Sequence, residues 1–340
     1  MNVIGLDIGG ANLKASNGDD WTAEAPFPMW KHPDKLGEAL RSLTANRVNG
    51  ETVLAVTMTG ELADCFRTKT EGVHAILVAV DRAFPQAPEL RIWQTGGEFF
   101  TLDEALEFPI LVAAANWHAQ ATWAGRACPE GAALLIDIGS TTTDIIPLWQ
   151  GTPVAEGGTD PLRLRSGELV YTGVRRTPLM ALSPDVNHQG QQTGVAAELF
   201  ATTRDLYLWT GELAESPDDC ETANGRPATR EWAYDRLTRM LCADRDEITP
   251  PEIDQLAKQW IGLQQGQVQR AIEQVIARLA DPVKIVLLSG EGEFLARQVV
   301  ASTPELAQAE MLSLASVLGP THSAGACAYA VARLAVERPL

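Results

Sequence analysis

Short apolar runs and helical spacings alternate along the chain, and each pattern predicts a different kind of element. Apolar runs bounded by Gly, Thr or Asp are typical of buried strands, and apolar residues three and four positions apart are typical of amphipathic helices. Strands that alternate with helices predict an α/β fold. We expect strands at 3–8, 53–57, 91–94, 133–138, 144–146 and 283–289, and helices at 34–43, 72–84, 109–125, 197–209, 231–241 and 251–279, from 294 and from 319.

One strand-and-turn pattern occurs twice. An apolar run leads into Asp7 and a glycine turn at the start of the chain, and a second run leads into Asp137 near the middle. Asp7 and Asp137 are 130 positions apart, and so are Gly9 and Gly139. Repetition at one offset predicts a duplicated fold whose halves face each other across a cleft. The alternative is a pair of unrelated β-hairpins whose aspartates cap the turns.

The two turns carry the residue types expected of a phosphate and magnesium site. Backbone N–H groups and hydroxyls of a Gly, Ser and Thr turn bind anions. Carboxylates are preferred ligands of Mg²⁺, so we expect this cofactor on the acids that also act in catalysis, Asp7, Asp137 and Asp144. The expected phosphate-binding residues are Gly9, Gly10, Asn12, Lys14, Gly139, Ser140, Thr141, Thr142, Arg175 and Arg176.

Two further polar positions follow predicted elements of the first half. The strand at 53–57 runs into Glu61, and ligand groups gather at strand ends in α/β sheets. Asn116 lies in the alanine-rich segment 109–125. Small residues there suit either close helix packing or a cleft wall, so Asn116 is a candidate site residue or a packing residue.

Arginines stand out in the second half of this acidic chain. Four of them, Arg163, Arg165, Arg175 and Arg176, lie close in sequence. A guanidinium grips phosphate or carboxylate with two hydrogen bonds, so the cluster is a candidate anion clamp. Taken singly, each is more often a solvated surface group. The segment 210–227 is long enough to be either a binding loop or disordered, and we favour a binding loop.

Composition narrows the class of protein. A length of 340 residues suits two domains, and no apolar run reaches the ~18 residues of a membrane span. The start of the chain has strand pattern without a basic segment, so we expect no signal peptide. Five scattered cysteines predict reduced thiols in the cytoplasm, and the five histidines form no zinc pattern. A net charge of −17 argues against nucleic acid as a partner but allows a small phosphorylated ligand.

The order of these elements resembles that of the actin/sugar-kinase/Hsp70 superfamily. The resemblance implies a duplicated ribonuclease H-like two-domain α/β fold with a central cleft. It implies a first domain of 1–128 plus 319–340, and a second domain of 129–318 with a helical insertion at 197–280. It also assigns a nucleoside-type turn to Ser289, Gly290 and Gly292.

One departure from that superfamily concerns the nucleoside-type turn. Its glycines are normally adjacent, whereas Glu291 separates Gly290 from Gly292 here. This argues against ATP and leaves the diphosphate site intact.

Within the superfamily, the second turn resembles the hydantoinase/oxoprolinase branch. The segments 58–62, 171–178, 202–205 and 224–230 are similar to the methanofuran-biosynthesis synthases of tetrahydromethanopterin-linked one-carbon metabolism. That family implies a transferase that joins a furan-methanol diphosphate to the phenol of γ-glutamyltyramine, or of a tyrosine analogue, and releases diphosphate. The implied partners are small molecules only, with no nucleic acid or membrane, and the protein is expected to be a monomer or homodimer.

The implied reaction suggests roles for further residues. A phenol has a pKa near ~10 and needs a base, for which Glu61 is the first candidate and Asp205 the second. The amine on the furan is expected to pair with a carboxylate, either that of Glu98 or that of Glu291. Carboxylates of the acceptor would suit Arg226 and Arg230, the expected substrate-binding residues together with Asn116. The alternatives are an ATP-dependent kinase or hydantoinase/oxoprolinase-like ATPase, and an actin-like filament or scaffold.

Overall fold

A computed structural model describes residues 2–45, 47–338 and 340 of the chain. Its first half contains a six-stranded sheet in the order β3-β2-β1-β4-β5-β6. β1, β2 and β3 pair antiparallel, whereas β4 and β5 run parallel to β1. The strands are β1 Asn2–Ile8, β2 Asn12–Ser16, β3 Thr22–Pro26, β4 Thr52–Met58, β5 Glu89–Trp93 and β6 Phe99–Phe100.

The second half repeats this topology. Its sheet has the order β10-β8-β7-β13-β14, with an antiparallel hairpin followed by two parallel strands, and β9 pairs with the far end of β8. The predicted duplication is therefore present in the strand order, and the reading as two unrelated hairpins is wrong. The strands are β7 Ala132–Ile138, β8 Thr143–Trp149, β9 Thr152–Pro153, β10 Leu169–Val170, β13 Val283–Ser289 and β14 Glu310–Ser313.

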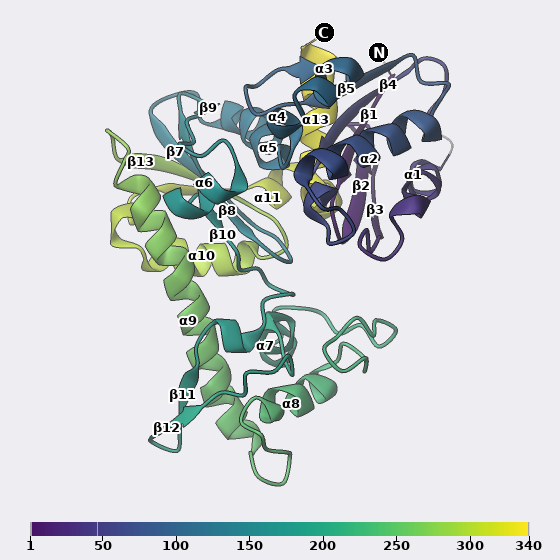
Figure 1. Cartoon of the computed structure of the whole chain (residues 1–340). Coiled ribbons are helices and arrows are strands. Elements are labelled where there is room, and N and C mark those ends of the chain that lie inside the picture. The colour runs from purple at the N-terminus through teal and green to yellow at the C-terminus, as the bar shows by residue number, and fades with distance from the viewer. Residues whose placement is uncertain (1, 46, 339) are drawn as a thin grey trace.

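Helices cover the outer face of each sheet. α1 (Leu36–Thr44) and α2 (Lys69–Ala83) bury their apolar faces against the first sheet. α10 (Glu293–Ser302) and the C-terminal part of α9 (Pro250–Ile276) do the same on the second sheet. Figure 1 shows the two sheets side by side in the upper part of the molecule.

Two helices rich in small residues lie between the sheets. α13 (Ala326–Glu337) packs on the inner face of the first sheet, while α5 (Asn116–Ala124) contributes side chains to the core on the inner face of each sheet. Small side chains are needed because the backbones approach closely. A Cβ added at Gly5 would lie only 2.1 Å from the carbonyl oxygen of Ala328.

The predicted single helix at 109–125 is wrong. α4 (Pro109–Val112) ends early, Ala114 has a left-handed backbone with φ of 48°, and α5 begins at Asn116. Tertiary packing overrides the high helix propensity of the alanine run here, because the chain must turn to pass from one sheet to the other.

A third core lies outside the two sheets and forms the lower lobe of Figure 1. Its buried residues run from Leu179 to Trp260. This core begins and ends earlier than the predicted insertion at 197–280, since the end of α9 belongs to the second sheet. The domain boundaries themselves stay a prediction. The lobe contains β11 Asp185–His188, β12 Gln191–Gly194, α7 Thr203–Thr210 and α8 Arg230–Arg239 with the start of α9.

The predicted helix at 197–209 begins six residues late, at Thr203. Thr202 and Asp205 form a reciprocal capping box there, which fixes the start of α7. Several short helices escaped the apolar pattern because each spans less than two turns. They are α3 Leu102–Glu107, α6 Asp160–Ser166, α11 Leu314–Leu318, η2 Gly60–Leu62, η3 Gly125–Ala127, η4 Leu179–Ala181 and η5 Pro304–Leu306. The helix expected from 319 is present in two pieces, α12 Pro320–Ala324 and α13, and η1 Pro33–Lys35 lies at the start of the helix expected at 34–43.

Among the residues that the structure describes, no helix combines the length and the apolar character needed to cross a membrane.

The contact between β1 and α13 predicts a stability effect. Gly5→Ala places a methyl group against the backbone of Ala328, so we expect a loss of about 1–3 kcal/mol from the free energy of unfolding. Gly158→Ala is the matched control, because nothing lies within 4 Å of its added Cβ, and it should change stability by less than about 0.5 kcal/mol. Urea unfolding measures both, and equal midpoints would contradict the close packing.

Candidate active site

The inner faces of the two sheets bring the two acidic turns together. Asp7 lies on the face of β1 that meets α13, while Asp137 lies on the face of β7 that meets α5. Lys14 is the direct neighbour of Asp7 in the β1–β2 pair. Burial lowers the pKa of Lys14, but the charges of Asp7, Glu24 and Asp137 raise it overall, so this ammonium is within electrostatic range of both turns.

The turns present free amides in the same region. The carbonyls of Gly10 and Ala11 accept hydrogen bonds from Met29 and Phe27, and the carbonyl of Ser140 accepts from Arg175 and Arg176. Across residues 2–45 and 47–338, by contrast, no hydrogen-bond partner is found for the amides of four turn residues. Free N–H groups in successive residues make an anion-binding nest. The four residues are Gly10, Ala11, Ser140 and Thr141.

Asp7 and Asp137 have strongly altered acidity. Burial raises the pKa of each carboxyl to about 6, and the nearby Lys14 charge opposes this in both. One buried oxygen, Oδ1, of each carboxylate has no hydrogen-bond partner within the described residues. A buried unpaired carboxylate oxygen is costly unless a cation or a proton meets it. These two oxygens therefore suit a divalent cation.

Asp144 has a different partner from the other two acids. Arg163 of α6 donates from Nη2 to its Oδ1 at 2.8 Å and also to the carbonyl of Glu168. The expected set of three aspartates does not form a direct metal cage. No group of three or more His, Cys, Asp or Glu in the described part of the chain is placed to hold a metal ion. Mg²⁺ binding stays a prediction, with Asp7 and Asp137 as the residues that fit.

Glu61 is the most unusual acid of the site. It is fully buried in η2, neither carboxylate oxygen has a partner in the part of the chain described, and burial raises its pKa to about 7. Its neighbour Gly60 packs on the carbonyls of Ile8 and Gly9, which places η2 against the first turn. Burial is the main cause of the raised pKa of both Glu61 and Asp144, and the charge of Asp160 in the second half adds to it in both.

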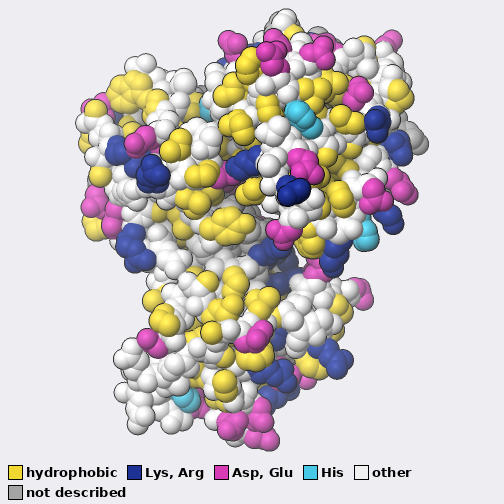
Figure 2. Space-filling view, viewed as in Figure 1, with side chains coloured by type: hydrophobic (Ala, Val, Ile, Leu, Met, Phe, Trp, Pro, Cys, Tyr) yellow, Lys and Arg dark blue, Asp and Glu magenta, His cyan; other side chains and the backbone are white. Residues whose placement is uncertain are grey.

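Contacts across the cleft hold its two sides together. Lys69 at the start of α2 pairs with Asp160 at the start of α6 at 2.7 Å. The guanidinium of Arg176 lies 5.3 Å from the centre of the Trp30 ring. In Figure 2, Lys and Arg side chains gather in the recess between the upper halves and the lower lobe.

The four arginines do not form the expected anion clamp. Arg163 is buried against Asp144 and the Trp117 ring, and Arg165 is exposed. Arg175 forms a two-point ion pair with Glu291, donating from Nε to Oε2 at 2.6 Å. Of the four, Arg175 and Arg176 contact the second turn through their amides, and both side chains already have a partner.

The nucleoside-type turn lies beside the second aspartate. A Cβ added at Gly290 would lie 2.3 Å from Oδ1 of Asp137, which explains why glycine is needed there. Ser289 accepts a hydrogen bond from Gln120 at 2.7 Å, and Gln120 in turn lies 3.3 Å from the thiol of Cys327. This buried chain connects β13, α5 and α13. Asn116, one turn before Gln120, lowers the pKa of Asp7 and so lies beside it.

Several expected residues lie away from the turns. Asp205 is buried, pairs with Arg236 at 2.7 Å and caps α7, so it is not placed to act as a base. Glu98 lines a different cavity of roughly 1220 Å³, which shares no lining residue with the two turns. The expected acceptor-binding arginines lie over tryptophan rings of the lower lobe, Arg226 over Trp232 and Arg230 over Trp209.

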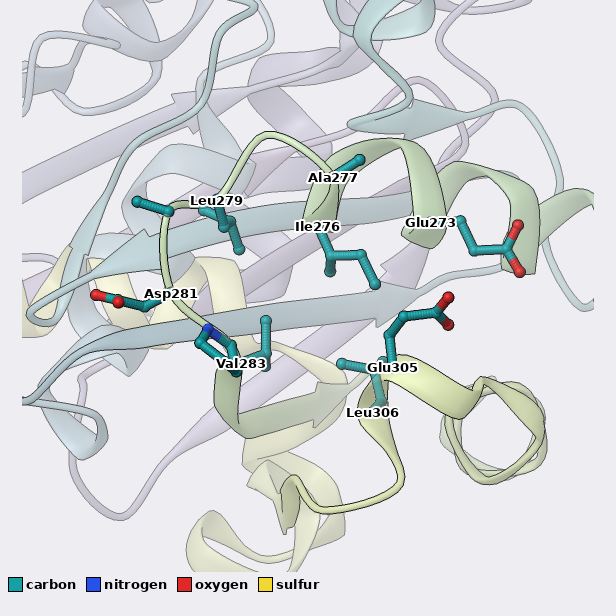
Figure 3. A pocket seen from close by; sticks show the side chains of 10 residues that line it. Glu273, Ile276, Ala277, Leu279, Asp281, Val283, Glu305 and Leu306 are labelled. Atoms are coloured by element: carbon teal, nitrogen blue, oxygen red, sulfur yellow. The ribbon is translucent and has the colours of Figure 1, made fainter.

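A second pocket carries none of the expected site residues. It lies at the end of α9, has a volume of roughly 500 Å³ and is lined mainly by apolar side chains such as Ile276 and Leu306 (Figure 3). Its two glutamates, Glu273 and Glu305, come from opposite walls, and we assign it no role in the site.

Sequence reasoning missed Gln120, Glu24 and the Lys69–Asp160 pair. Gln120 follows Asn116 by four positions and so shares its helix face, which is a signal that was present. Glu24 pairs with Lys14 in the β2–β3 register, but the hairpin register could not be read in advance. The Lys69–Asp160 pair joins distant segments and left no local signal.

Two sheets of the same strand order around one cleft, each with an acidic glycine turn on its inner face, define the actin/sugar-kinase/Hsp70 class of α/β proteins, as expected. The chain belongs to the Hydantoinase/oxoprolinase family, whose family model matches residues 52–338. The fold is similar to the nucleotide-free structure of acetone carboxylase, with a TM-score of 0.56 and 12% identity, covering 97% of this chain and 70% of that one.

The resemblance to methanofuran-biosynthesis synthases is confirmed by two relatives. A protein of Methanocaldococcus jannaschii named (4-{4-(2-(gamma-L-glutamylamino)ethyl)phenoxymethyl}furan-2-yl)methanamine synthase is 32% identical over 98% of this chain and 97% of its own length. A protein of Methanococcus vannielii with the same name is 29% identical over 59% of this chain and 89% of its own length. Both names describe enzymes.

The buried carboxyl of Glu61 predicts a pH-dependent stability. Its folded pKa of about 7 lies above the ordinary 4.5, so the folded state holds a proton that the unfolded state has lost. Glu61 therefore makes folding less favourable as pH rises from 4.5 to about 7, by an amount on the order of 3 kcal/mol. Glu61→Gln should thus gain stability relative to the wild type between pH 5 and 8. The control is the exposed Glu107→Gln, and parallel pH curves in urea unfolding would refute the burial argument.

The Arg163–Asp144 pair predicts a second stability effect. Arg163→Met leaves the Asp144 carboxylate without its partner, so we expect a loss of about 3–5 kcal/mol. Adding Asp144→Asn should recover part of this loss, because the unpaired charge is removed. The exposed Arg165→Met serves as control and should cost less than about 0.5 kcal/mol in chemical denaturation. A single variant Arg163→Met as stable as the control would show that the pair does not support the fold.

Proposed function

We propose that the protein is a transferase of methanofuran biosynthesis. It joins an aminomethyl-furan-methyl diphosphate to the phenol of γ-glutamyltyramine, or of a tyrosine analogue, through an ether bond. The observation that carries this proposal is the 32% identity to a named synthase along almost the whole length of both chains. The substrates are small molecules. The described part of the chain has no disulfide, and its free cysteines fit a reducing cytoplasm.

The step is a substitution at the furan methylene carbon. The bond from this carbon to the diphosphate oxygen breaks and both electrons leave with diphosphate. The phenol oxygen supplies the new bond and its proton passes to a base. Because the furan ring stabilises positive charge on the carbon, the main task of the protein is to accept the negative charge that builds up on diphosphate.

The residues around the two turns are suited to that task. The free amides of Gly10, Ala11, Ser140 and Thr141 would donate to the diphosphate oxygens, as preorganised donors do in other enzymes. Lys14 adds a positive charge within electrostatic range of both turns. Asp7 and Asp137 would hold Mg²⁺ through their unpaired oxygens, and a bound Mg²⁺ supplies further neutralisation of the leaving group.

Glu61 is the proposed base for the phenol. A pKa of about 7 leaves a large share of this carboxyl ionised at neutral pH and makes it a stronger base than an exposed glutamate. Its neighbour Gly60 packs against the first turn, which supports a position of Glu61 close to the proposed diphosphate site.

An ATP-dependent kinase or ATPase is the alternative within this fold class. It would need a nucleoside pocket at 289–293, where Glu291 is instead held by Arg175. Calorimetric titration with ATP and with inorganic diphosphate separates the two. Tight binding of ATP without binding of diphosphate would favour the alternative.

The proposed function predicts a loss of activity on removing a turn carboxylate. Asp137→Asn should lower turnover by about 10²–10³-fold, since one of the two carboxylates that would hold Mg²⁺ beside the diphosphate is lost. Mass spectrometry of the ether product and of released diphosphate measures this. The exposed Asp103→Asn is the control, and an unchanged unfolding midpoint shows that the variant is folded. Full activity of Asp137→Asn would contradict the proposed site.

A further inference from the structure

The ion pair between Arg175 and Glu291 lies at the meeting point of three parts of the molecule. The amide of Arg175 is hydrogen-bonded to the second turn, and Glu291 lies in the nucleoside-type turn after β13. The charges of Asp219, from the lower lobe, and of Glu24, from β3, also raise the pKa of Arg175. The guanidinium therefore pairs with Glu291 and feels the charges of carboxylates from the first half and from the lobe.

Both partners stay within reach of a ligand. The side chain of Arg175 is 34% exposed and that of Glu291 is 35% exposed, unlike the fully buried pair of Arg236 and Asp205. An ion pair at this level of exposure contributes at most about 1 kcal/mol. The free energy needed to separate Arg175 from Glu291 is therefore small, and each can pair with a charged group of a ligand instead.

The backbone of each partner adjoins the proposed diphosphate site. The amide of Arg175 donates to the carbonyl of Ser140 at 3.0 Å. Gly290, the residue before Glu291, packs against Asp137. A ligand whose diphosphate occupied the turns would therefore bring charged groups next to this pair.

The surrounding charges set a condition on that exchange. If a diphosphate drew Arg175 away, the Glu291 carboxylate would lose the cation that pairs with it. Arg204 does not replace it, because Arg204 is buried and bound to Asp219 and to the carbonyl of Glu221. The unpaired Glu291 carboxylate would repel the diphosphate and oppose binding unless the ligand itself supplied a positive charge.

We propose that the Arg175–Glu291 pair selects ligands that carry a diphosphate and a primary ammonium in one molecule. On binding, Arg175 turns to the diphosphate, for which a guanidinium provides two hydrogen bonds, and Glu291 accepts the ammonium. Both charges of the pair are then matched again. A furan diphosphate that lacks the amine pairs with Arg175 but leaves Glu291 without a partner, so it binds less tightly than the substrate with the amine. This inference rests on the proposed function, since it names how the same site recognises its diphosphate substrate.

The proposal also chooses between Glu98 and Glu291, the two carboxylates that the sequence offered as partners of the furan amine. Glu98 lines the cavity on the other side of α5, with His118 and Arg338, and has no contact with the turns. Glu291 follows Gly290 directly, and Gly290 touches the Asp137 carboxylate. Glu291 is therefore the specificity-determining residue, and it has no part in breaking the carbon–oxygen bond.

Binding of inorganic diphosphate tests the exchange without any turnover. Glu291→Gln frees Arg175 from its partner, so calorimetry should show tighter binding of inorganic diphosphate by about fivefold, the change in affinity that corresponds to about 1 kcal/mol. Arg175→Met should weaken it by a similar factor. Glu293→Gln is the matched control, because Glu293 pairs with Arg297 one turn later in the same helix, α10, and the substitution should leave the affinity unchanged. An unchanged affinity in Glu291→Gln would overturn the exchange.

Two substrates then test the selectivity. The wild type should use aminomethyl-furan-methyl diphosphate at least about tenfold better, in kcat/KM, than the analogue with a methyl group in place of the aminomethyl group. Glu291→Gln should lose most of this preference while it still turns over the analogue. A preference retained in Glu291→Gln would overturn the role of Glu291. If the wild type releases diphosphate from neither compound, the proposed function fails, whereas the calorimetric result still stands.

Discussion

The candidate site depends on one ammonium group within electrostatic range of two buried carboxylates. Asp7 and Asp137 come from different halves of the chain, and each would resist burial as a charged group. Lys14 is placed by the β1–β2 register, and its charge makes burial of both carboxylates less costly. The helices α5 and α13 can fill the remaining space between the sheets because their small residues allow close contact. The geometry of the cleft follows from these requirements.

The three aspartates, similar in the sequence, have different environments. Asp7 and Asp137 keep an unpaired oxygen, while Asp144 is neutralised by Arg163, whose guanidinium also covers Trp117. Burial raises the pKa of all three carboxyls. The position of the nearby cations therefore decides which carboxylate keeps an oxygen free to bind a ligand. The same reasoning divides the arginines into two groups. Arg163 and Arg236 are buried, pair with aspartates and stabilise the fold, whereas the partly exposed Arg175 can exchange its partner Glu291 for a ligand.

Sequence reasoning was strongest where the pattern was local. Strands with apolar runs, the glycine turns at Gly9 and Gly139, and the long helix α9 were all predictable, since each depends on neighbouring residues. It was weaker for the segment 109–125, where alanine favours helix but the crossing between sheets requires a break at Ala114. It also assigned Asp205 a chemical role, although that residue caps α7 and holds Arg236.

The sequence by itself determined the duplicated α/β architecture and the two acidic turns, because the apolar periodicity and the offset between Asp7 and Asp137 are properties of the chain alone. Only the tertiary structure decided which charges meet. The pairing of Arg175 with Glu291, of Arg163 with Asp144 and of Lys69 with Asp160 depends on how distant segments pack. Electrostatic partners are set by distance in space, and no spacing in the sequence encodes that distance.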